Sequence, residues 1–187
     1  MAEARTLARR AKQAQMEIAE LSQERIDAIV DAMAAAVAPQ SEALARLAVE
    51  ETGYGVVADK VQKNQFSADR VYRFIRPMKT VGVLRRLEDR KVIEIAEPFG
   101  VVAAIVPSTN PTSTAIYKIL IAIKARCAIV LSPHPAAVKC ITRVAEVMEE
   151  AATRAGAPAG AINWMTTVTI EGTNELMKHR EIGRAHV

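Results

Sequence analysis

Residues 97–135, EPFGVVAAIVPSTNPTSTAIYKILIAIKARCAIVLSPHP, decide the fold that we predict for this chain. They begin with an apolar, β-branched run at 99–106 and end with a second apolar run at 128–131. Between the two runs, Pro111 begins a helix that we expect to end near Ala125, because proline is favoured in the first turn of a helix. Two short apolar strands joined by a helix predict a βαβ unit of a parallel sheet.

Two proline-rich turns, 107–111 and 132–135, follow the two predicted strands. In open α/β sheets, ligands bind beyond the carboxyl ends of the strands. The sequence therefore predicts that the functional site lies at these two turns.

Length and composition exclude several classes of protein. The 187 residues suffice for one domain or two small ones with a substantial core. Aromatic residues make up only 4%, and the net charge of +4 comes from interleaved basic and acidic residues, so we expect no nucleic-acid partner. No apolar run approaches the roughly 18–20 residues that cross a bilayer. The N-terminus has no apolar signal segment. Cys127 and Cys140 form neither a disulfide framework nor a metal-binding spacing. We therefore predict a cytoplasmic protein with no membrane contact and no metal site.

The apolar pattern divides the chain into four parts. Residues 1–80 are a helical segment, in which Ser22 and Ser41 are candidate helix caps and Gly53 is a helix stop. Residues 81–97 form two short strands around a charged turn, which predicts a β-hairpin. Residues 98–180 alternate strand and helix three times, with the later elements at 136–155, 161–165 and 170–179. Residues 181–187 follow as a tail.

The segment EPFGVVAAIVPSTNPTST, followed by VLSPHP, resembles the aldehyde dehydrogenase superfamily, and within it the coenzyme A-acylating branch of acetaldehyde and sulfoacetaldehyde dehydrogenases. The likeness extends to EETGYGVVADKVQKN at 50–64 and EGTNELMKH at 171–179, and so covers nearly the whole chain. It implies the N-terminal part of an enzyme that converts an aldehyde, CoA and NAD to an acyl-CoA and NADH. The implied fold is α/β and aldehyde dehydrogenase-like. In it, the helical segment and the β-hairpin precede a truncated, Rossmann-like parallel βαβαβ domain, which binds the nicotinamide cofactor with residues 98–180.

The resemblance implies a catalytic role for one residue of the first turn. In the family, a cysteine thiolate attacks the aldehyde, hydride leaves for the nicotinamide, and coenzyme A takes up the resulting thioester. The oxyanion formed by the attack needs preorganised hydrogen-bond donors. The resemblance assigns this role to the side-chain amide of Asn110. The alternative is that Asn110 is only a turn residue before a proline.

The resemblance also implies where the cofactor binds. Segment 132–135 matches the segment in which hydrolytic aldehyde dehydrogenases hold the adenosine ribose with a lysine and a glutamate, and both are absent here. Ser132 can still donate to a ribose hydroxyl, and a pocket without an acidic residue repels a 2′-phosphate less, so NAD is expected and NADP stays open. Residues 156–158 match a turn that lines the adenine pocket, and no G-x-G-x-x-G is present. The predicted cofactor-binding residues are Val106, Pro107, Ser108, Thr109, Asn110, Ser132, Pro133, His134, Pro135, Gly156, Ala157 and Pro158.

The nucleophile of the family is expected outside this chain. Cys127 and Cys140 are both interpreted as small buried residues, and His134 as a loop residue. The strand that should follow residues 176–179 is expected to be absent, because EIGRAHV at 181–187 does not continue the family's apolar pattern. Codons GAG ATC GGA AGA GCA CAC GTC would match a short-read sequencing adapter. We therefore predict a non-native tail on a truncated gene fragment, with a native tail as the alternative.

Two other functions stay open. One is a hydrolytic aldehyde dehydrogenase, against which the SPHP segment argues. The other is a non-catalytic protein that binds nucleotide or pairs with a full-length subunit. For the complete enzyme we expect a small aldehyde and CoA as partners, a homo-oligomeric state, and a location in the cytoplasm or in a bacterial microcompartment. The chain alone is expected to be inactive.

Overall fold

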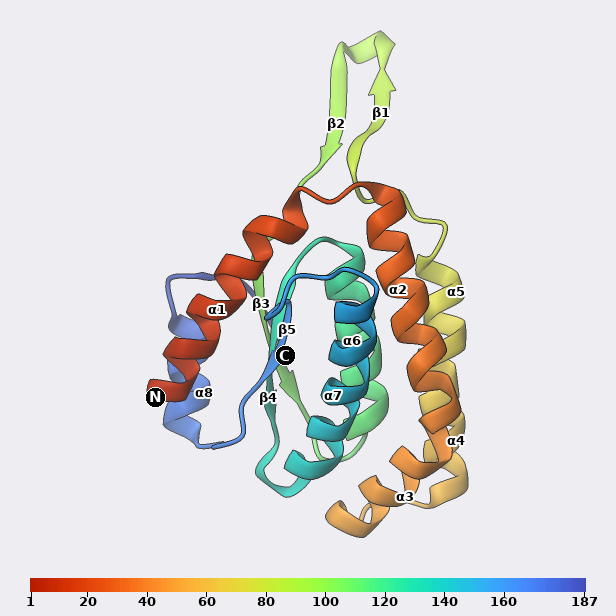
Figure 1. Cartoon of the computed structure of the whole chain (residues 1–187), viewed down its shortest axis with the longest axis vertical. Helices are drawn as coiled ribbons and strands as arrows, with labels where there is room; N and C mark the ends of the chain where they lie inside the picture. The colour runs from red at the N-terminus through yellow and green to blue at the C-terminus, as the bar shows by residue number, and fades with distance from the viewer.

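A parallel sheet of four strands, in the order β5-β4-β3-β6, lies at the centre of the computed structural model, which describes all residues 1–187 (Figure 1). β3 and β4 pair in register along their whole length, and both are buried nearly throughout. This is the burial expected of central parallel strands that helices cover on both faces. The predicted βαβ unit is therefore confirmed. The strands are β3 (Val101–Val106), β4 (Ala128–Pro133), β5 (Ile162–Trp164) and β6 (Ile182–His186).

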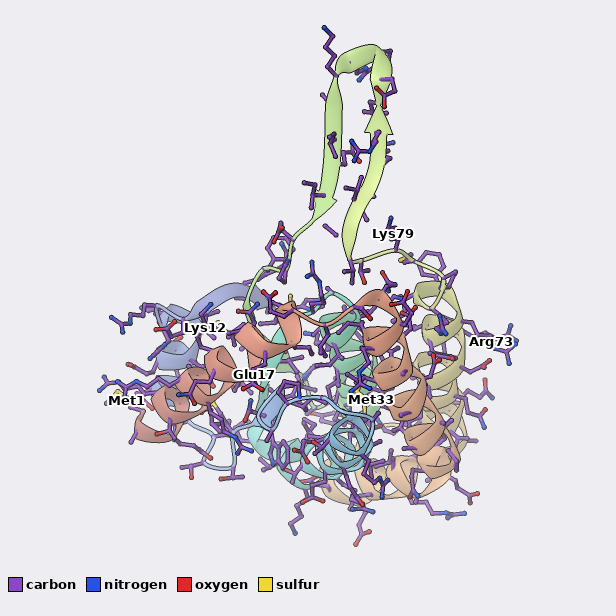
Figure 2. All side chains as sticks on the ribbon, turned by 45° about the horizontal axis from the view of Figure 1, so that its top comes forward. Met1, Lys12, Glu17, Met33, Arg73 and Lys79 are labelled. Atoms are coloured by element: carbon purple, nitrogen blue, oxygen red, sulfur yellow. The ribbon has the colours of Figure 1, made fainter.

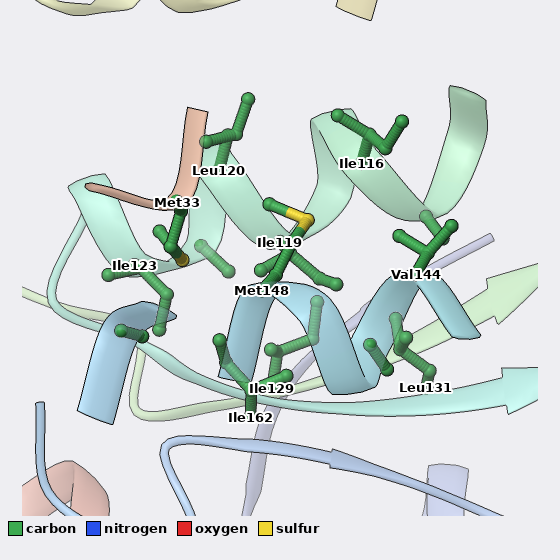
Figure 3. Close-up of a cluster of buried hydrophobic side chains, with 14 of the residues drawn as sticks. Met33, Ile116, Ile119, Leu120, Ile123, Ile129, Leu131, Val144, Met148 and Ile162 are labelled. Atoms are coloured by element: carbon green, nitrogen blue, oxygen red, sulfur yellow. The ribbon is translucent and has the colours of Figure 1, made fainter. Parts of the chain in front are cut away.

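Helices α6 (Pro111–Lys124) and α7 (Val138–Arg154) cover one face of the sheet, and α2 (Gln23–Val37) packs on their outer side (Figure 1). The main hydrophobic core lies between these elements. Figure 3 shows its centre, where side chains of the three helices gather over β4, among them Met33, Ile119 and Met148. Helix α6 is buried nearly all round because it lies between the sheet and α2, which explains its almost continuous apolar sequence.

Helices α1 (Ala2–Ala19) and α8 (Ile170–Lys178) cover the opposite face around a smaller core (Figure 1). Glu3 fastens α1 to the loop after β5, since its carboxylate accepts hydrogen bonds from the Thr166 amide at 2.9 Å and from the Thr166 hydroxyl at 2.7 Å. The N-terminal segment thus supplies helices on both sides of the sheet, and the division at residues 80 and 97 stays a prediction. Small buried side chains on α1 allow it to lie close to the strands: Ala4, Ala8, Ala11 and Ala14.

The remaining helices pack beside α2, α6 and α7. They are η1 (Ala38–Gln40), α3 (Ser41–Thr52), α4 (Val57–Gln65), the π-helical turn η2 (Phe66–Val71), α5 (Tyr72–Ile75) and the short turn η4 (Pro135–Ala137). Ser22 caps α2 and Gly53 ends α3 with a φ of 70°, as predicted. The prediction that Ser41 caps α3 is wrong. η1 leads directly into α3, so Ser41 is already helical, and its hydroxyl donates to the Ala38 carbonyl at 2.7 Å. No helix combines the length and the apolar character of a membrane-spanning segment.

The predicted β-hairpin extends away from the rest of the structure (Figures 1 and 2). It consists of β1 (Gly82–Leu87) and β2 (Val92–Ala96), antiparallel and joined by the turn η3 (Glu88–Arg90). Lys79 lies at its base (Figure 2). The buried Arg126 guanidinium fixes that base, because it donates to the carbonyls of Ala19 at the end of α1 and Ala96 at the end of β2.

The fourth strand, β6, was not expected from the sequence. Residues 182–186 pair with β3 in parallel, so the prediction that no strand follows residue 179 is wrong. The apolar pattern misses β6 because it is an edge strand whose only large apolar residue is Ile182. Lys118 of α6 also joins the two strands, since its ammonium donates to the carbonyls of Ile105 and His186 at 2.7 and 2.9 Å. The non-native origin of residues 181–187 stays a prediction.

Candidate functional site

A cleft of about 360 Å³ opens beyond the carboxyl ends of β3 and β4, where the sequence predicts the site. The turn after each strand forms one wall, and the start of α8 forms another. Half of the predicted cofactor-binding residues line this cleft: Val106, Pro107, Ser132, Pro133, His134 and Pro135.

Hydroxyl groups supply the polar part of the cleft. The Ser132 side chain is 1% exposed, and its hydroxyl lies 2.8 Å from the Thr173 hydroxyl on α8. Each hydroxyl can donate or accept, so the pair can also form a hydrogen bond with a polar group of a ligand. No acidic side chain lines the cleft. His134 is a loop residue, as interpreted: its Nδ1 accepts from the Ala136 amide at 3.1 Å and begins η4.

The first turn of α8 was missed as part of the site. Thr169 caps this helix by accepting from the Gly172 amide at 3.0 Å, and Thr169, Ile170 and Thr173 all line the cleft. The sequence carried a usable signal, because the helix predicted at 170–179 follows a third parallel strand. Parallel strands bring their carboxyl ends to one edge, so the start of this helix belongs beside the two proline-rich turns.

Residues 156–158, by contrast, do not reach the cleft. They join α7 to β5 and therefore lie at the amino ends of the strands, the opposite edge of the sheet. Gly156 has a φ of 100°, and a Cβ there would collide with the guanidinium of Arg25 at the start of α2. The structure does not bring Gly156, Ala157 and Pro158 together with the other predicted residues.

Asn110 lies on the turn that connects β3 to α6, beyond Pro107 of the cleft wall. It is the N-cap residue of α6, and its carbonyl accepts from the Thr114 amide at 3.1 Å. Its side-chain oxygen accepts from the Lys63 ammonium at 2.9 Å. An ammonium can only donate, so the oxygen is the amide atom that faces Lys63. The Asn110 amide nitrogen keeps two N–H donors that have no partner in the chain.

The two cysteines are buried, as predicted, at 1% exposure for Cys127 and 0% for Cys140. Burial raises the pKa of the Cys127 thiol. Cys140 lies in the first turn of α7, where a helix N-terminus would ordinarily favour a thiolate. However, the Glu51 carboxylate caps that turn, accepting from the amides of Lys139 and Cys140 at 2.7 Å each. Burial and this carboxylate raise the pKa of Cys140, so neither thiol is set up as a nucleophile.

The fold and cleft together define the class. The molecule is a doubly wound α/β protein with a ligand cleft at the carboxyl edge of its parallel sheet, of the type that binds nucleotides. The family model of the aldehyde dehydrogenase family matches residues 1–186, and the chain belongs to that family.

Known relatives narrow the comparison. The chain is 44% identical over 182 residues to the bifunctional aldehyde-alcohol dehydrogenase of Escherichia coli K12. The aligned region covers 97% of this chain and 20% of that protein. The solved acetylating aldehyde dehydrogenase of Geobacillus thermoglucosidasius is 53% identical with a TM-score of 0.95, covering 97% of this chain and 40% of that one. Rhodopseudomonas palustris propionaldehyde dehydrogenase, solved with bound CoA and an acylated cysteine, is 27% identical with a TM-score of 0.83, at 96% and 40% coverage. The chain thus spans about a fifth of the length of the E. coli relative.

Proposed function

We propose that this chain is the cofactor-side part of an NAD(P)-dependent, CoA-acylating aldehyde dehydrogenase, which converts an aldehyde, CoA and NAD to an acyl-CoA and NADH. One observation carries the proposal. The Asn110 amide presents two unpartnered N–H donors on the turn after β3, the turn whose first residue, Pro107, lines the cleft. Preorganised neutral donors are what the oxyanion of a thiolate–aldehyde adduct requires. The acetylating and propionaldehyde-oxidising relatives support this reaction class.

The cleft suits the nucleotide part of the cofactor. Paired hydroxyls of Ser132 and Thr173 offer donors and acceptors to a ribose, and apolar walls offer a surface to a flat ring. The absence of an acidic lining residue removes the usual repulsion of a 2′-phosphate, so we expect NAD to bind and NADP to be tolerated. When bound, the cofactor supplies the nicotinamide that accepts hydride. Residues 98–180 make up this partial cofactor domain.

The nucleophile must come from another part of the enzyme, because both cysteines here are buried and their pKa values are raised. The contribution of this chain is to hold the cofactor and to stabilise the oxyanion. A hydrolytic enzyme is less well supported, since the cleft lacks a lysine and a carboxylate for the ribose.

We further propose that the complete enzyme is a homo-oligomer located in the cytoplasm. The hairpin supports self-association because it carries exposed apolar side chains away from the core, with Leu84, Ile93 and Ile95 at 42%, 49% and 57% exposure. Large exposed apolar groups on an isolated two-stranded ribbon are typical of a contact surface.

Cofactor titration tests the proposed site. The 187-residue chain, labelled with ¹⁵N, would be titrated with NAD⁺ and NADP⁺ and followed by NMR. We expect shifts at His134 and 169–173 and none at 156–158. Thr173→Val should weaken binding about fivefold, the worth of one hydrogen bond, whereas the exposed control Thr153→Val should change it by less than about twofold. Shifts centred on 156–158, or no binding at millimolar nucleotide, would contradict the site.

Activity tests the reaction. Residues 1–179 would replace the equivalent segment of the Geobacillus enzyme, and CoA-dependent NADH production from acetaldehyde would be measured. We expect activity that falls about 10²-fold or more in Asn110→Ala. An active chimera whose rate is unaffected by Asn110→Ala would refute the oxyanion role. An inactive chimera that still binds NAD⁺ would favour a non-catalytic nucleotide-binding protein.

A further inference from the structure

We propose that Lys63 is a positioning residue for Asn110, and that α4 acts as a clamp that holds the oxyanion-binding turn. This inference rests on the proposed function, because it assumes that the Asn110 amide receives the oxyanion. The motif concerned is KVQKN at 60–64, within the segment 50–64 that carries part of the family likeness.

Three side chains of α4 contact the turn in order. Lys60, Lys63 and Asn64 are spaced by three and four, so they share one face of the helix. The Lys60 ammonium donates to the Thr109 carbonyl at 2.8 Å, and the Lys63 ammonium donates to the Asn110 side-chain oxygen at 2.9 Å. Asn64 completes the row by accepting from the Thr112 hydroxyl at 2.7 Å.

The inner part of the clamp is buried. Lys60 is 4% exposed and Asn64 is fully buried. Asn64 also donates to the Ser41 carbonyl at 3.0 Å, which ties α3 to the same unit. The residues on either side of Asn110 are therefore both held by α4, Thr109 through its backbone carbonyl and Thr112 through its side-chain hydroxyl. Lys63 is exposed, and its ammonium forms its one hydrogen bond with the Asn110 side chain.

Lys63 decides which way the Asn110 amide points. The terminal torsion of asparagine is broad and roughly two-fold, so a free amide presents oxygen and nitrogen to the site about equally. An amide oxygen facing an oxyanion would repel it. Because Lys63 can bond only to the oxygen, it selects the orientation in which both N–H groups are free for the substrate.

The charges of the clamp are also arranged for a developing anion. The two ammonium groups are one helical turn apart, and neither forms a salt bridge with a carboxylate. Burial, followed by the charge of Lys63, lowers the pKa of Lys60. Two neighbouring cations without a counter-ion raise the local positive potential, which stabilises negative charge at Asn110. Hydrogen bonding to Lys63 also polarises the amide and strengthens its N–H donors.

The first test uses the full 187-residue chain and does not need activity. The side-chain ¹⁵N–¹H₂ pair of Asn110 would be assigned with Asn110→Asp and compared between the chain and Lys63→Met. We expect this pair to shift in Lys63→Met and to return toward its original position in Lys63→Arg. Lys79→Met, at an exposed lysine on the base of the hairpin, is the matched control and should leave it unmoved. An unmoved Asn110 pair in Lys63→Met would overturn the proposal.

The second test measures kinetics in the chimera with the Geobacillus enzyme. We expect Lys63→Met to lower kcat about tenfold, a part of the worth of an oxyanion donor, with the aldehyde KM within about twofold because ground-state binding is not involved. Lys63→Arg should restore most of the rate, and Lys63→Met should lower the rate less in the Asn110→Ala background than in the unchanged one. A Lys63→Met enzyme no slower than Lys79→Met, or an equal loss in the Asn110→Ala background, would refute positioning. An Asn110→Ala enzyme with an unchanged rate would instead refute the proposed function itself.

Discussion

The bond between Asn64 and Thr112 is a buried support of the turn that carries Asn110, and its energy can be measured. Asn64 is fully buried, and Thr112 in the first turn of α6 is 2% exposed. We consider three variants: Asn64→Leu, which keeps the volume but removes the amide, Thr112→Val, which replaces the hydroxyl with a methyl group, and the double variant.

The magnitudes follow from what each change leaves behind. Asn64→Leu leaves the buried Thr112 hydroxyl without its hydrogen-bond partner and removes the bond to Ser41. It should therefore cost about 2 kcal/mol of unfolding free energy. Thr112→Val leaves the buried Asn64 side-chain oxygen without a hydrogen-bond donor and should cost about 1.5 kcal/mol of unfolding free energy. The double variant leaves neither of these two groups unpaired, since it removes both. Its cost should therefore be about 2 kcal/mol, less than the sum of the two single-variant costs. The coupling energy is therefore about 1.5 kcal/mol.

Urea unfolding of the 187-residue chain, followed by far-ultraviolet circular dichroism, gives the four free energies of this cycle. The slope of free energy against urea should be the same in all four proteins, since none of the changes alters the surface exposed on unfolding. Strict additivity, with a coupling energy below about 0.5 kcal/mol, would mean that the two side chains are not bonded and that α4 does not support the turn in this way.

Three further predictions concern other parts of the molecule. Lys124→Met should cost about 2–3 kcal/mol in urea unfolding, because the buried ammonium pairs with Asp27 and the carboxylate loses that partner. Burial alone would raise the pKa of Glu3, but hydrogen bonds from the loop after β5 outweigh it and lower the pKa. This stabilisation is present above the unfolded-state pKa of about 4.3 and is lost as pH falls through the lower folded pKa. The urea midpoint should therefore fall with acid less steeply in Glu3→Gln than in the unchanged chain. The chain alone should produce no NADH from acetaldehyde, CoA and NAD⁺, since burial raises the pKa of both Cys127 and Cys140.

Each of these has a matched control or a contrary outcome. The unfolding free energy of Lys79→Met should stay within about 0.5 kcal/mol of that of the unchanged chain, as it does for exposed substitutions. If Lys124→Met lost no more than Lys79→Met, the ion pair would not stabilise the fold. Identical acid profiles for Glu3→Gln and the unchanged chain would show that Glu3 does not fasten α1. Rapid iodoacetamide labelling of the folded chain, at a rate near that in urea, would contradict the burial of the thiols.

Local sequence patterns sufficed for the central elements. β3 and β4 could be predicted because helices bury them on both faces, which imposes a continuous apolar run. α6 and α7 could be predicted because burial imposes an apolar pattern on them too, along one stripe in α7, and intrinsic propensity reinforces these patterns. The hairpin and the glycine that ends α3 also followed from local chemistry, since charged turns and left-handed residues act within a few positions.

What sequence reasoning missed depends on contacts between distant segments. β6 forms because Gly183 allows the chain to pass close to the carbonyl of Phe99, where any Cβ would collide. Lys63 and Asn110 are 47 positions apart, so no local pattern pairs them. Residues 156–158 and 169–173 flank the same short strand, β5, and only the direction of that strand determines which segment reaches the cleft.

Glu51 has a consequence for how a dinucleotide can lie on this protein. Its carboxylate takes the amides of Lys139 and Cys140, so α7 already carries an internal counter-anion where a phosphate would otherwise bind. Helix α6 begins with Pro111, which lacks one of the N–H groups that a phosphate would use. The start of α7 is thereby closed to the pyrophosphate, and the start of α6 offers it one N–H group fewer. We therefore expect the cofactor to cross the sheet edge along a path other than that of a glycine-rich dinucleotide fold.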